Sequence, residues 1–184
     1  MGKKNARMRA FFALSLSLLL APCWAEPPPQ PVAFRVGPLL FDRPEGWRWV
    51  KPEGSFRAAQ LEKSGPGKTL LLMTFSRFPA GTGGTVQANI DRWIRQFSHT
   101  SSPADVRSVT PGSYPVTLVK IRGALKGGLP GGPDKEIPDA LLLGAILEAE
   151  GEMIVVKMAG SASSLSTEEK AFGEMISGAA EKRP

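Results

Sequence analysis

Hydrophobic positions along this chain predict two groups of β-strands, each followed by a helix. Residues 56–62 and 69–78 flank a Gly-Pro-Gly turn and predict a hairpin. Residues 140–160 predict a second hairpin, and residues 116–124 predict a further long strand. Several of these strands are apolar at nearly every position, which is typical of strands covered on both faces.

The segment after the first hairpin has the period of an amphipathic helix. Its apolar residues recur at a spacing of three or four and would lie on one helical face: Val86, Ile90, Trp93, Ile94 and Phe97. Gly84 or Thr85 is expected to cap the N-terminus of this helix. A polar loop that contains His99, the only histidine, is expected to follow it.

The C-terminal segment predicts the second helix. Ser166 and Glu169 have the spacing of a capping box, in which each side chain bonds the backbone of the other residue. The apolar residues that follow share one helical face: Phe172, Met175, Ile176 and Ala179. This segment is expected to close the fold.

The order of these elements predicts the α+β class. Tight turns within each strand group require antiparallel neighbours, because parallel strands need long crossover connections. Strands that are apolar on both faces need a layer on each side, and two amphipathic helices can supply part of that cover. We therefore expect residues 32–184 to form a single domain, a twisted antiparallel sheet of about six to seven strands flanked by two main helices.

The first 25 residues have the pattern of a secretory signal peptide. Basic residues precede an apolar run over residues 11–21, which is shorter than the roughly 20 residues that a membrane span needs. Cleavage is expected after Ala25, before a proline-rich leader of residues 26–31, and would give an exported protein, periplasmic or extracellular, without a transmembrane span. The alternative is a lipoprotein anchored at Cys23, although Pro22 stands where a lipobox has a small residue.

Cleavage would also change the charge of the protein and remove its only cysteine. The chain has 23 basic and 17 acidic residues, and loss of the four basic residues of the signal leaves 19 basic residues and a net charge of +2. Nucleic-acid binding normally needs a concentrated basic surface, so no nucleic-acid partner is expected. Without cysteine, the domain would have no disulfide, no thiolate metal ligand and no cysteine nucleophile.

Three segments together resemble a known group of proteins: "RPEGWRW", "ANIDRWIRQF" and the hairpin "GAILEAEGEMIVVKMAG". They are similar to an uncharacterised family of exported bacterial proteins, whose layout is similar to the PsbP-like fold of an extrinsic photosystem subunit and a Ran-binding nuclear import factor. The resemblance covers about residues 39–177 and rests on packing motifs. It implies a PsbP-like sandwich and a non-enzymatic role in binding or assembly, although fold alone does not transfer a function.

Two glycine-containing turns have features of phosphate-binding loops. Gly83 and Gly84 precede the first predicted helix, where backbone amides and the helix dipole can hold an anion. Their spacing matches neither a dinucleotide-binding fingerprint nor a Walker loop, which favours a structural turn. The segment "GPGKT" ends like a Walker motif, but Glu62 stands where that motif needs a glycine and a strand follows. We interpret it as a hairpin turn.

Three tryptophans are candidate ligand or partner contacts. Trp47 and Trp49 alternate with Arg48 and can point to one face of a strand, and Trp93 lies on the apolar helix face. They could line a groove, but aromatic residues at regular spacing more often form core, and Trp49 is the one expected to be partly exposed. The glycine- and proline-rich loop of residues 126–138 is the other binding candidate.

The residue types present favour binding over catalysis. One histidine and no carboxylate pair at a meaningful spacing leave few reaction classes, so we predict no catalytic residue, no cofactor and no metal site. Glu148, Glu150 and Glu152 cluster at the second hairpin turn and are interpreted as exposed charge rather than a calcium site.

Two functions therefore stay open. The first is an exported non-enzymatic protein that binds another envelope protein or assists an assembly, through a sheet edge or the long loop. The alternative is a carrier of a small molecule or lipid with a pocket between helix and sheet, which an apolar pocket on the order of several hundred Å³ beside Trp47 or Trp93 would favour. An exposed apolar patch over a filled core would favour partner binding. A hydrolase would need His99 to converge with a serine and a carboxylate.

Overall fold

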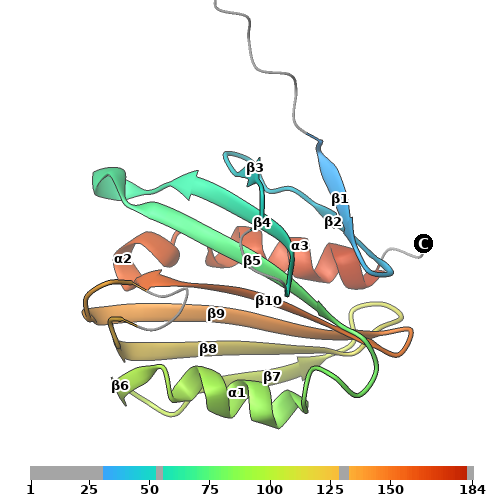
Figure 1. The fold of residues 1–184 in the computed structure, drawn as a ribbon. Helices are drawn as coiled ribbons and strands as arrows, with labels where there is room; N and C mark the ends of the chain where they lie inside the picture. Colours follow the sequence, from blue (N-terminus) through green and yellow to red (C-terminus); the bar gives the residue numbers. More distant parts are fainter. Residues whose placement is uncertain (1–30, 53–55, 129–132, 182–184) are drawn as a thin grey trace, which may run out of the picture.

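The computed structural model describes residues 31–52, 56–128 and 133–181. Figure 1 shows a large twisted sheet with helix α3 on one face and helix α1 on the other. The strands are β1 (Ala33–Val36), β2 (Leu39–Asp42), β3 (Arg48–Val50), β4 (Arg57–Ser64), β5 (Leu70–Phe78), β6 (Phe97–Thr100), β7 (Asp105–Val109), β8 (Val116–Leu125), β9 (Ile137–Ala149) and β10 (Glu152–Ser161). The helices are η1 (Pro66–Lys68), α1 (Val86–Ile94), α2 (Ala162–Leu165) and α3 (Glu169–Glu181).

Within the described residues, eight strands form the main sheet in the order β3-β4-β5-β10-β9-β8-β6, with β7 also pairing with β8. Every neighbouring pair is antiparallel, which confirms the α+β class and the antiparallel sheet. The sheet has more strands than the six to seven expected, and β1 and β2 form a further two-stranded sheet. Strands β3 and β6 have only three and four residues, too few to show a period in the sequence.

The larger of two hydrophobic cores lies between the sheet and the layer of α2, α3 and the β1–β2 hairpin. Phe75 of β5 is fully buried there, with its ring 5.0 Å from that of Phe34 and 5.1 Å from that of Phe41. The predicted apolar face of the C-terminal helix is confirmed, because the four side chains named above are all buried. This face of the sheet is closed by packed side chains.

The smaller core lies between the sheet and α1. Side chains of β9 alternate between the two cores: Leu141 and Leu143 belong to the larger core, and Leu142 and Ile146 belong to the smaller one. The continuous apolar run of this strand therefore reflects cover on both faces, as predicted.

Helix α1 is shorter than its apolar pattern predicted. It ends at Ile94, which is partly exposed, and Phe97 begins strand β6 instead of the last helical turn. Phe97 stays in the smaller core because β6 pairs with β8, where Phe97 lies opposite Leu125. His99 lies opposite Ala124 in the same strand, so the prediction of a loop at this position is wrong.

The predicted capping box at the second helix is also wrong. Ser166 ends the short helix α2, and its hydroxyl donates to the carbonyl of Ala162 at 2.7 Å. The Glu169 carboxylate instead accepts a hydrogen bond from Lys120 Nζ on β8 at 2.6 Å. Both side chains find partners outside the helix start, which spacing alone does not reveal.

The predicted signal peptide, its cleavage after Ala25 and the alternative lipid anchor at Cys23 lie outside the described residues. Strand β1 begins at Ala33, directly after the predicted leader. Among the helices of the described residues, none is long and apolar enough to cross a membrane.

Candidate ligand-binding groove

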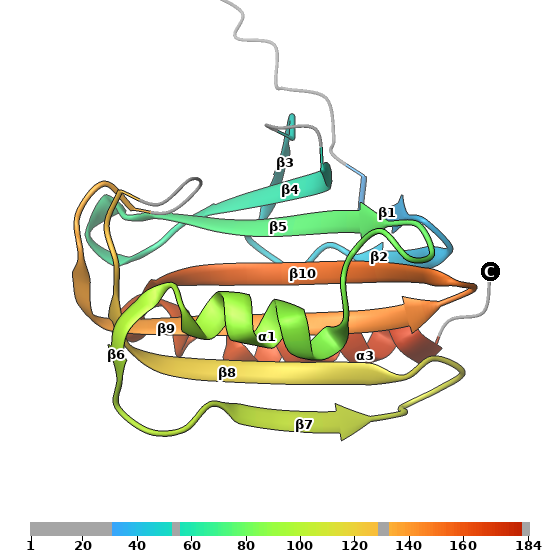
Figure 2. The same cartoon turned by 60° about the horizontal axis from the view of Figure 1, so that its bottom comes forward.

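Helix α1 covers only part of its face of the sheet. A helix is about 10 Å wide and neighbouring strands lie about 4.8 Å apart, so one helix covers roughly two strands. Figure 2 shows α1 lying across β9 beside β8, while β5 and β4 have no helix over them on this side. The face of the sheet on which α1 lies is therefore uncovered over β5.

The open strip is a groove with a volume of about 700 Å³, which we call the α1 groove. Its floor is formed by alternate residues of β5 and β10: Leu72, Thr74, Ser76, Val155, Lys157 and Ala159. Its sides are formed by α1 with the residues after it, by the start of β4 and by both ends of the β8–β9 loop: Asn89, Arg92, Trp93, Arg95, Gln96, Arg57, Lys126, Pro133 and Ile137. The volume is within the range of about 300–1,000 Å³ that is usual for small-molecule sites.

The glycine-rich loop contributes to this groove through its two ends. Lys126 and Pro133 both line the groove, and the backbone amide of Gly128 donates to the carbonyl of Pro133 at 2.8 Å, which holds the two ends together. Strand β9 begins at Ile137, so the last two residues of the predicted loop belong to this strand. The loop and the helix that the sequence analysis treated as separate candidates thus meet at one site.

Lys157 places an ammonium group on the groove floor without a carboxylate partner among the described residues. It lies on β10 between Thr74 of β5 and Gly144 of β9, and its Nζ donates to Oε1 of Gln96 at 3.3 Å. Burial lowers the pKa of Lys157, and the positive charge of Arg57 lowers that pKa further. Both effects disfavour the charged form, which a bound anion would favour.

Five cationic side chains line the α1 groove, and no aspartate or glutamate is among its described lining residues. Their polar contacts are with neutral groups: Arg57 donates to Gln60, Arg92 to Asn89 and Lys126 to the carbonyl of Arg95. Ion pairs between described residues lie elsewhere, for example Arg48–Glu62, Arg77–Glu152 and Arg122–Asp139. The groove is thus a region of uncompensated positive charge among the described residues.

Trp93 forms one wall of the groove because a glycine lies beneath it. The indole occupies the space above Gly144 so closely that a Cβ atom there would lie 2.4 Å from Cζ3 of Trp93. That distance is far below van der Waals contact, so any larger residue would displace the indole. Trp93 is itself buried in the smaller core, and it also lines the groove.

The candidate glycines form a structural turn into α1. Thr85 caps the helix, and its hydroxyl oxygen accepts a hydrogen bond from the amide of Ala88 at 3.0 Å. The Asn89 side chain donates to the carbonyl of Gly83 at 3.0 Å, which closes the turn from inside. Gly84 has a φ of +74°, a conformation that favours glycine. These contacts account for both glycines without an anion.

The other two candidate tryptophans lie on the opposite side of the sheet from Trp93. Trp47 is buried in the larger core, where its Nε1 donates to the Glu168 carboxylate at 3.0 Å. Trp49 is partly buried against the same core and meets Phe34 edge-on at 5.6 Å. The structure therefore does not bring the three tryptophans together, and only Trp93 lines the α1 groove.

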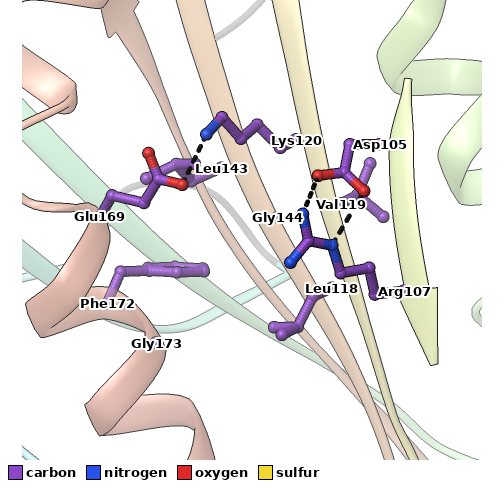
Figure 3. A pocket seen from close by; sticks show the side chains of 10 residues that line it. All are labelled: Asp105, Arg107, Leu118, Val119, Lys120, Leu143, Gly144, Glu169, Phe172 and Gly173. Atoms are coloured by element: carbon purple, nitrogen blue, oxygen red, sulfur yellow. Dashed lines mark hydrogen bonds and ion pairs between the residues drawn. The ribbon is translucent and has the colours of Figure 1, made fainter. Parts of the chain in front are cut away.

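A second, smaller pocket of about 180 Å³ lies between α3 and strands β7 and β8 (Figure 3). Its charged side chains bond one another: Arg107 binds Asp105 at 2.7 Å, and Lys120 binds Glu169 at 2.6 Å. The hydrogen bond from Arg107 is the main cause that lowers the pKa of Asp105. The pocket is small and its charges are compensated, so it is a weaker ligand site than the α1 groove.

The residues that a hydrolase would need do not converge. His99 forms no hydrogen bond with a hydroxyl or carboxylate of the described residues, and the neighbouring Ser98 donates to Glu136 instead. At the second hairpin, Glu152 pairs with Arg77 and Glu150 accepts from Tyr114. The described part of the chain contains no cluster of three or more His, Cys, Asp or Glu residues that could hold a metal ion.

Comparison with known proteins adds no functional information. No protein-family model matches the chain, and no curated protein matches it. Among solved structures, the chain is similar to PA94, a protein of unknown function from Pseudomonas aeruginosa, at 11% identity and a TM-score of 0.47. That similarity covers 79% of this chain and 92% of PA94. It is too low to support a conclusion about either fold or function.

Sequence reasoning missed Lys157 and Arg57, although one signal was present. Lys157 interrupts the apolar run "MIVVKMAG" at a position where the alternation requires its side chain to share a face with Val155 and Ala159. A charge inside such a run indicates either an uncovered face or a ligand. The sequence around Arg57 contains no comparable signal. The side chain of Arg57 faces the groove because of a register shift between Arg57 and Ala59 of β4, which the sequence pattern does not reveal.

Proposed function

We propose that this protein binds a small, largely apolar molecule in the α1 groove and carries or stores it without chemical change. The observation that carries the proposal is the groove of about 700 Å³ beside Trp93, between helix and sheet. The sequence analysis expected a pocket of this kind for a carrier of a small molecule and not for a protein that only binds a partner.

The apolar surface of the groove supports this proposal. Leu70 is 53% exposed on β5 and lines the groove, as do Leu72, Leu125 and Ile137. A ligand that removes such apolar surface from water gains a favourable binding free energy of about 25 cal/mol per Å². Binding requires no reactive side chain, which agrees with the residue types of the chain.

The remaining predictions fit a carrier that acts outside the cytoplasm. The predicted signal peptide would export the chain, and we propose that it acts in the periplasm or extracellular space. We also propose that the two-layer cover of its antiparallel sheet belongs to the PsbP-like arrangement that the sequence resembles, whose members mostly bind rather than catalyse.

The test uses N-phenyl-1-naphthylamine, an uncharged apolar probe whose fluorescence rises when it leaves water. Protein recovered from cells that express the full chain is titrated with the probe, next to the variant Ser76→Trp, which fills the groove floor. The matched control is Ser108→Trp on β7, where Ser108 is exposed. We expect saturable binding to the parent and the control, and affinity reduced about tenfold or more in Ser76→Trp, equal to about 1.4 kcal/mol. Equal binding by all three proteins would place the probe elsewhere and refute the proposal.

Binding to an envelope partner stays a second prediction, and one observation favours a surface for it. All five residues of the edge strand β7 are exposed, among them Val106 and Val109. An uncovered edge strand can pair with a strand of another chain. Val106→Lys together with Val109→Lys would abolish such pairing without reaching the α1 groove, which pull-down from the envelope with and without the double variant would reveal.

A further inference from the structure

We propose that the ligand of the α1 groove is a single-chain amphiphile with an anionic headgroup, and that Lys157 and Arg57 bind the headgroup. This inference rests on the proposed function, because it names the chemical class of molecule that the groove holds. It is carried by the position of two cations on the floor and side of the groove, next to the apolar residues of β5.

The two cations lie close together through the sheet register. Lys157 pairs with Thr74 of β5, and Arg57 of β4 pairs with Ser76, two residues along the same strand. Cross-strand neighbours project from the same face, so both cations join Thr74 and Ser76 on the groove side. The polar part of the floor is thus at its centre.

The side chains around these cations leave them available to an anion. The Arg57 guanidinium donates from Nη1 to Gln60 at 2.9 Å, and the Lys157 ammonium donates to Gln96 at 3.3 Å. Both partners are neutral amides, and an ammonium group has three hydrogens to donate. A carboxylate or phosphate can accept the unused hydrogens without breaking either contact.

The surrounding charges favour the same class of ligand. Arg92, Arg95 and Lys126 line the same groove, and their field adds to that of the two floor cations. At Lys157, burial and the charge of Arg57 both disfavour the charged ammonium and lower its pKa. An anion would relieve both, whereas a cationic or neutral headgroup would relieve neither.

The rest of the groove suits a hydrocarbon chain better than a peptide. Leu70 and Leu72 on one side and Ile137 and Leu125 on another offer apolar contacts beyond the cations. Under the two floor cations, the ladder of β5 and β10 runs from Met153–Phe78 to Lys157–Thr74, so the backbone groups there already bond within the sheet. Over this part of the floor a peptide backbone would find few hydrogen-bond partners, whereas an alkyl chain needs none.

The experiment compares dodecyl ligands that share one chain and differ in the headgroup. Laurate and dodecyl phosphate carry an anion, dodecanol is neutral, and dodecyltrimethylammonium is cationic. Each competes with N-phenyl-1-naphthylamine below its micelle concentration, and acetate and inorganic phosphate provide the anions without a chain. We expect both anionic amphiphiles to bind about ten- to a hundredfold more tightly than dodecanol, the cationic one to bind least, and the short anions not to compete.

Variants assign this preference to the floor cations. Lys157→Met keeps a similar side-chain volume and removes the charge, Arg57→Met does the same on β4, and Lys157→Arg restores the charge. The matched control is Lys170→Met on α3, which changes the net charge equally but removes a side chain that is 88% exposed. We expect the advantage of laurate over dodecanol to fall about tenfold in each floor Met variant and to persist in Lys157→Arg and Lys170→Met.

Each outcome separates this inference from the proposed function. If all dodecyl ligands bind equally and Ser76→Trp still blocks them, the groove is an apolar site and the anionic headgroup is refuted. If acetate or phosphate competes as well as laurate, or if an acidic peptide displaces laurate, the amphiphile is refuted. If no dodecyl ligand and no probe binds, the proposed function fails together with the inference.

Discussion

The two faces of the central sheet differ in how completely they are covered. On the α3 face, two helices and a hairpin enclose a core in which Phe75 and Trp47 are fully or almost fully buried. On the α1 face, one helix of nine residues leaves β5 open to solvent and Leu70 half exposed. The same strands therefore supply a closed core on one side and a groove on the other.

One charged side chain on each face shows the consequence of this difference: a buried carboxylate on the α3 face and a half-buried ammonium on the α1 face. Glu168 on the α3 face is 6% exposed, and its carboxylate accepts from Lys63 at 2.7 Å and from Trp47 at 3.0 Å. Lys157 on the α1 face has a single neutral partner at 3.3 Å. Folded proteins tolerate buried charge when it is bonded, so the unpaired cation is the one that calls for a ligand.

The largest change in stability is expected from truncating a buried side chain of β5, compared with a side chain on the groove face of the same strand. Phe75→Ala empties a site in contact with two other rings and should lower the free energy of unfolding by about 3–5 kcal/mol. Leu70→Ala on the groove face removes a half-exposed side chain and should change it by less than about 0.5 kcal/mol, while weakening ligand binding. Urea unfolding of both variants tests this contrast, and comparable losses would mean that the α1 face is closed in solution.

Removal of the paired charge should give the next largest effect. Glu168→Met leaves the Lys63 ammonium and the Trp47 Nε1 without their acceptor. Loss of one partner of a buried pair commonly costs about 3–5 kcal/mol, and we expect about 2–3 kcal/mol here because the Lys63 side chain is 29% exposed and can reach water. Lys63→Met provides the reciprocal control, and a double variant less destabilised than the sum of the two would establish the coupling.

A smaller effect is expected from filling the space beneath Trp93. Gly144→Ala places a Cβ atom 2.4 Å from the indole, so Trp93 must move into the groove. Overpacking of this kind should cost about 1–3 kcal/mol and should reduce ligand affinity at the same time. Gly178→Ala on α3 is the control, because nothing lies within 4 Å of the added Cβ atom and Gly178 does not line the groove. Unchanged affinity in Gly144→Ala would separate Trp93 from the site.

Sequence pattern predicted most of this fold but only two parts of the groove, Trp93 and the loop of residues 126–138. Hydrophobic period located the long strands, α1 and the buried face of α3, because each of these elements has enough residues to repeat a pattern. It failed at β6, which pairs with the distant strand β8, and at Ser166, whose hydroxyl bonds the carbonyl of Ala162 four residues earlier instead of capping α3. Trp93 was identified from its helical position, whereas its role as a wall depends on Gly144, which lies 51 residues away in the sequence.

The charge on the groove floor could not be predicted for a related reason. Whether Lys157 lies in water or beneath a helix depends on how many strands α1 covers, which is a property of the width of the sheet. The strand count was the part of the fold that the sequence underestimated, because the short strands show no period. A narrower sheet would have been covered by one helix, and no groove would follow.

The smallest predicted effect is a pH dependence of stability that belongs to Lys157. Burial first and the charge of Arg57 second lower its pKa in the folded protein, with Arg92, Arg95 and the neutral Gln96 also facing the same groove. Between this lowered pKa and the unfolded value of about 10.4, the unfolded chain binds more protons, so the free energy of unfolding rises with pH. The penalty is absent above 10.4 and grows as pH falls below it, so Lys157→Met should be more stable than the parent by about 1 kcal/mol at neutral pH, and this gap should shrink as pH approaches 10.4. Thermal unfolding of parent, Lys157→Met and Lys170→Met across pH 7–10 measures the gap. Saturating laurate should remove it, because an anion on the floor favours the charged lysine, and a gap independent of both pH and laurate would show that no uncompensated charge lies in the groove.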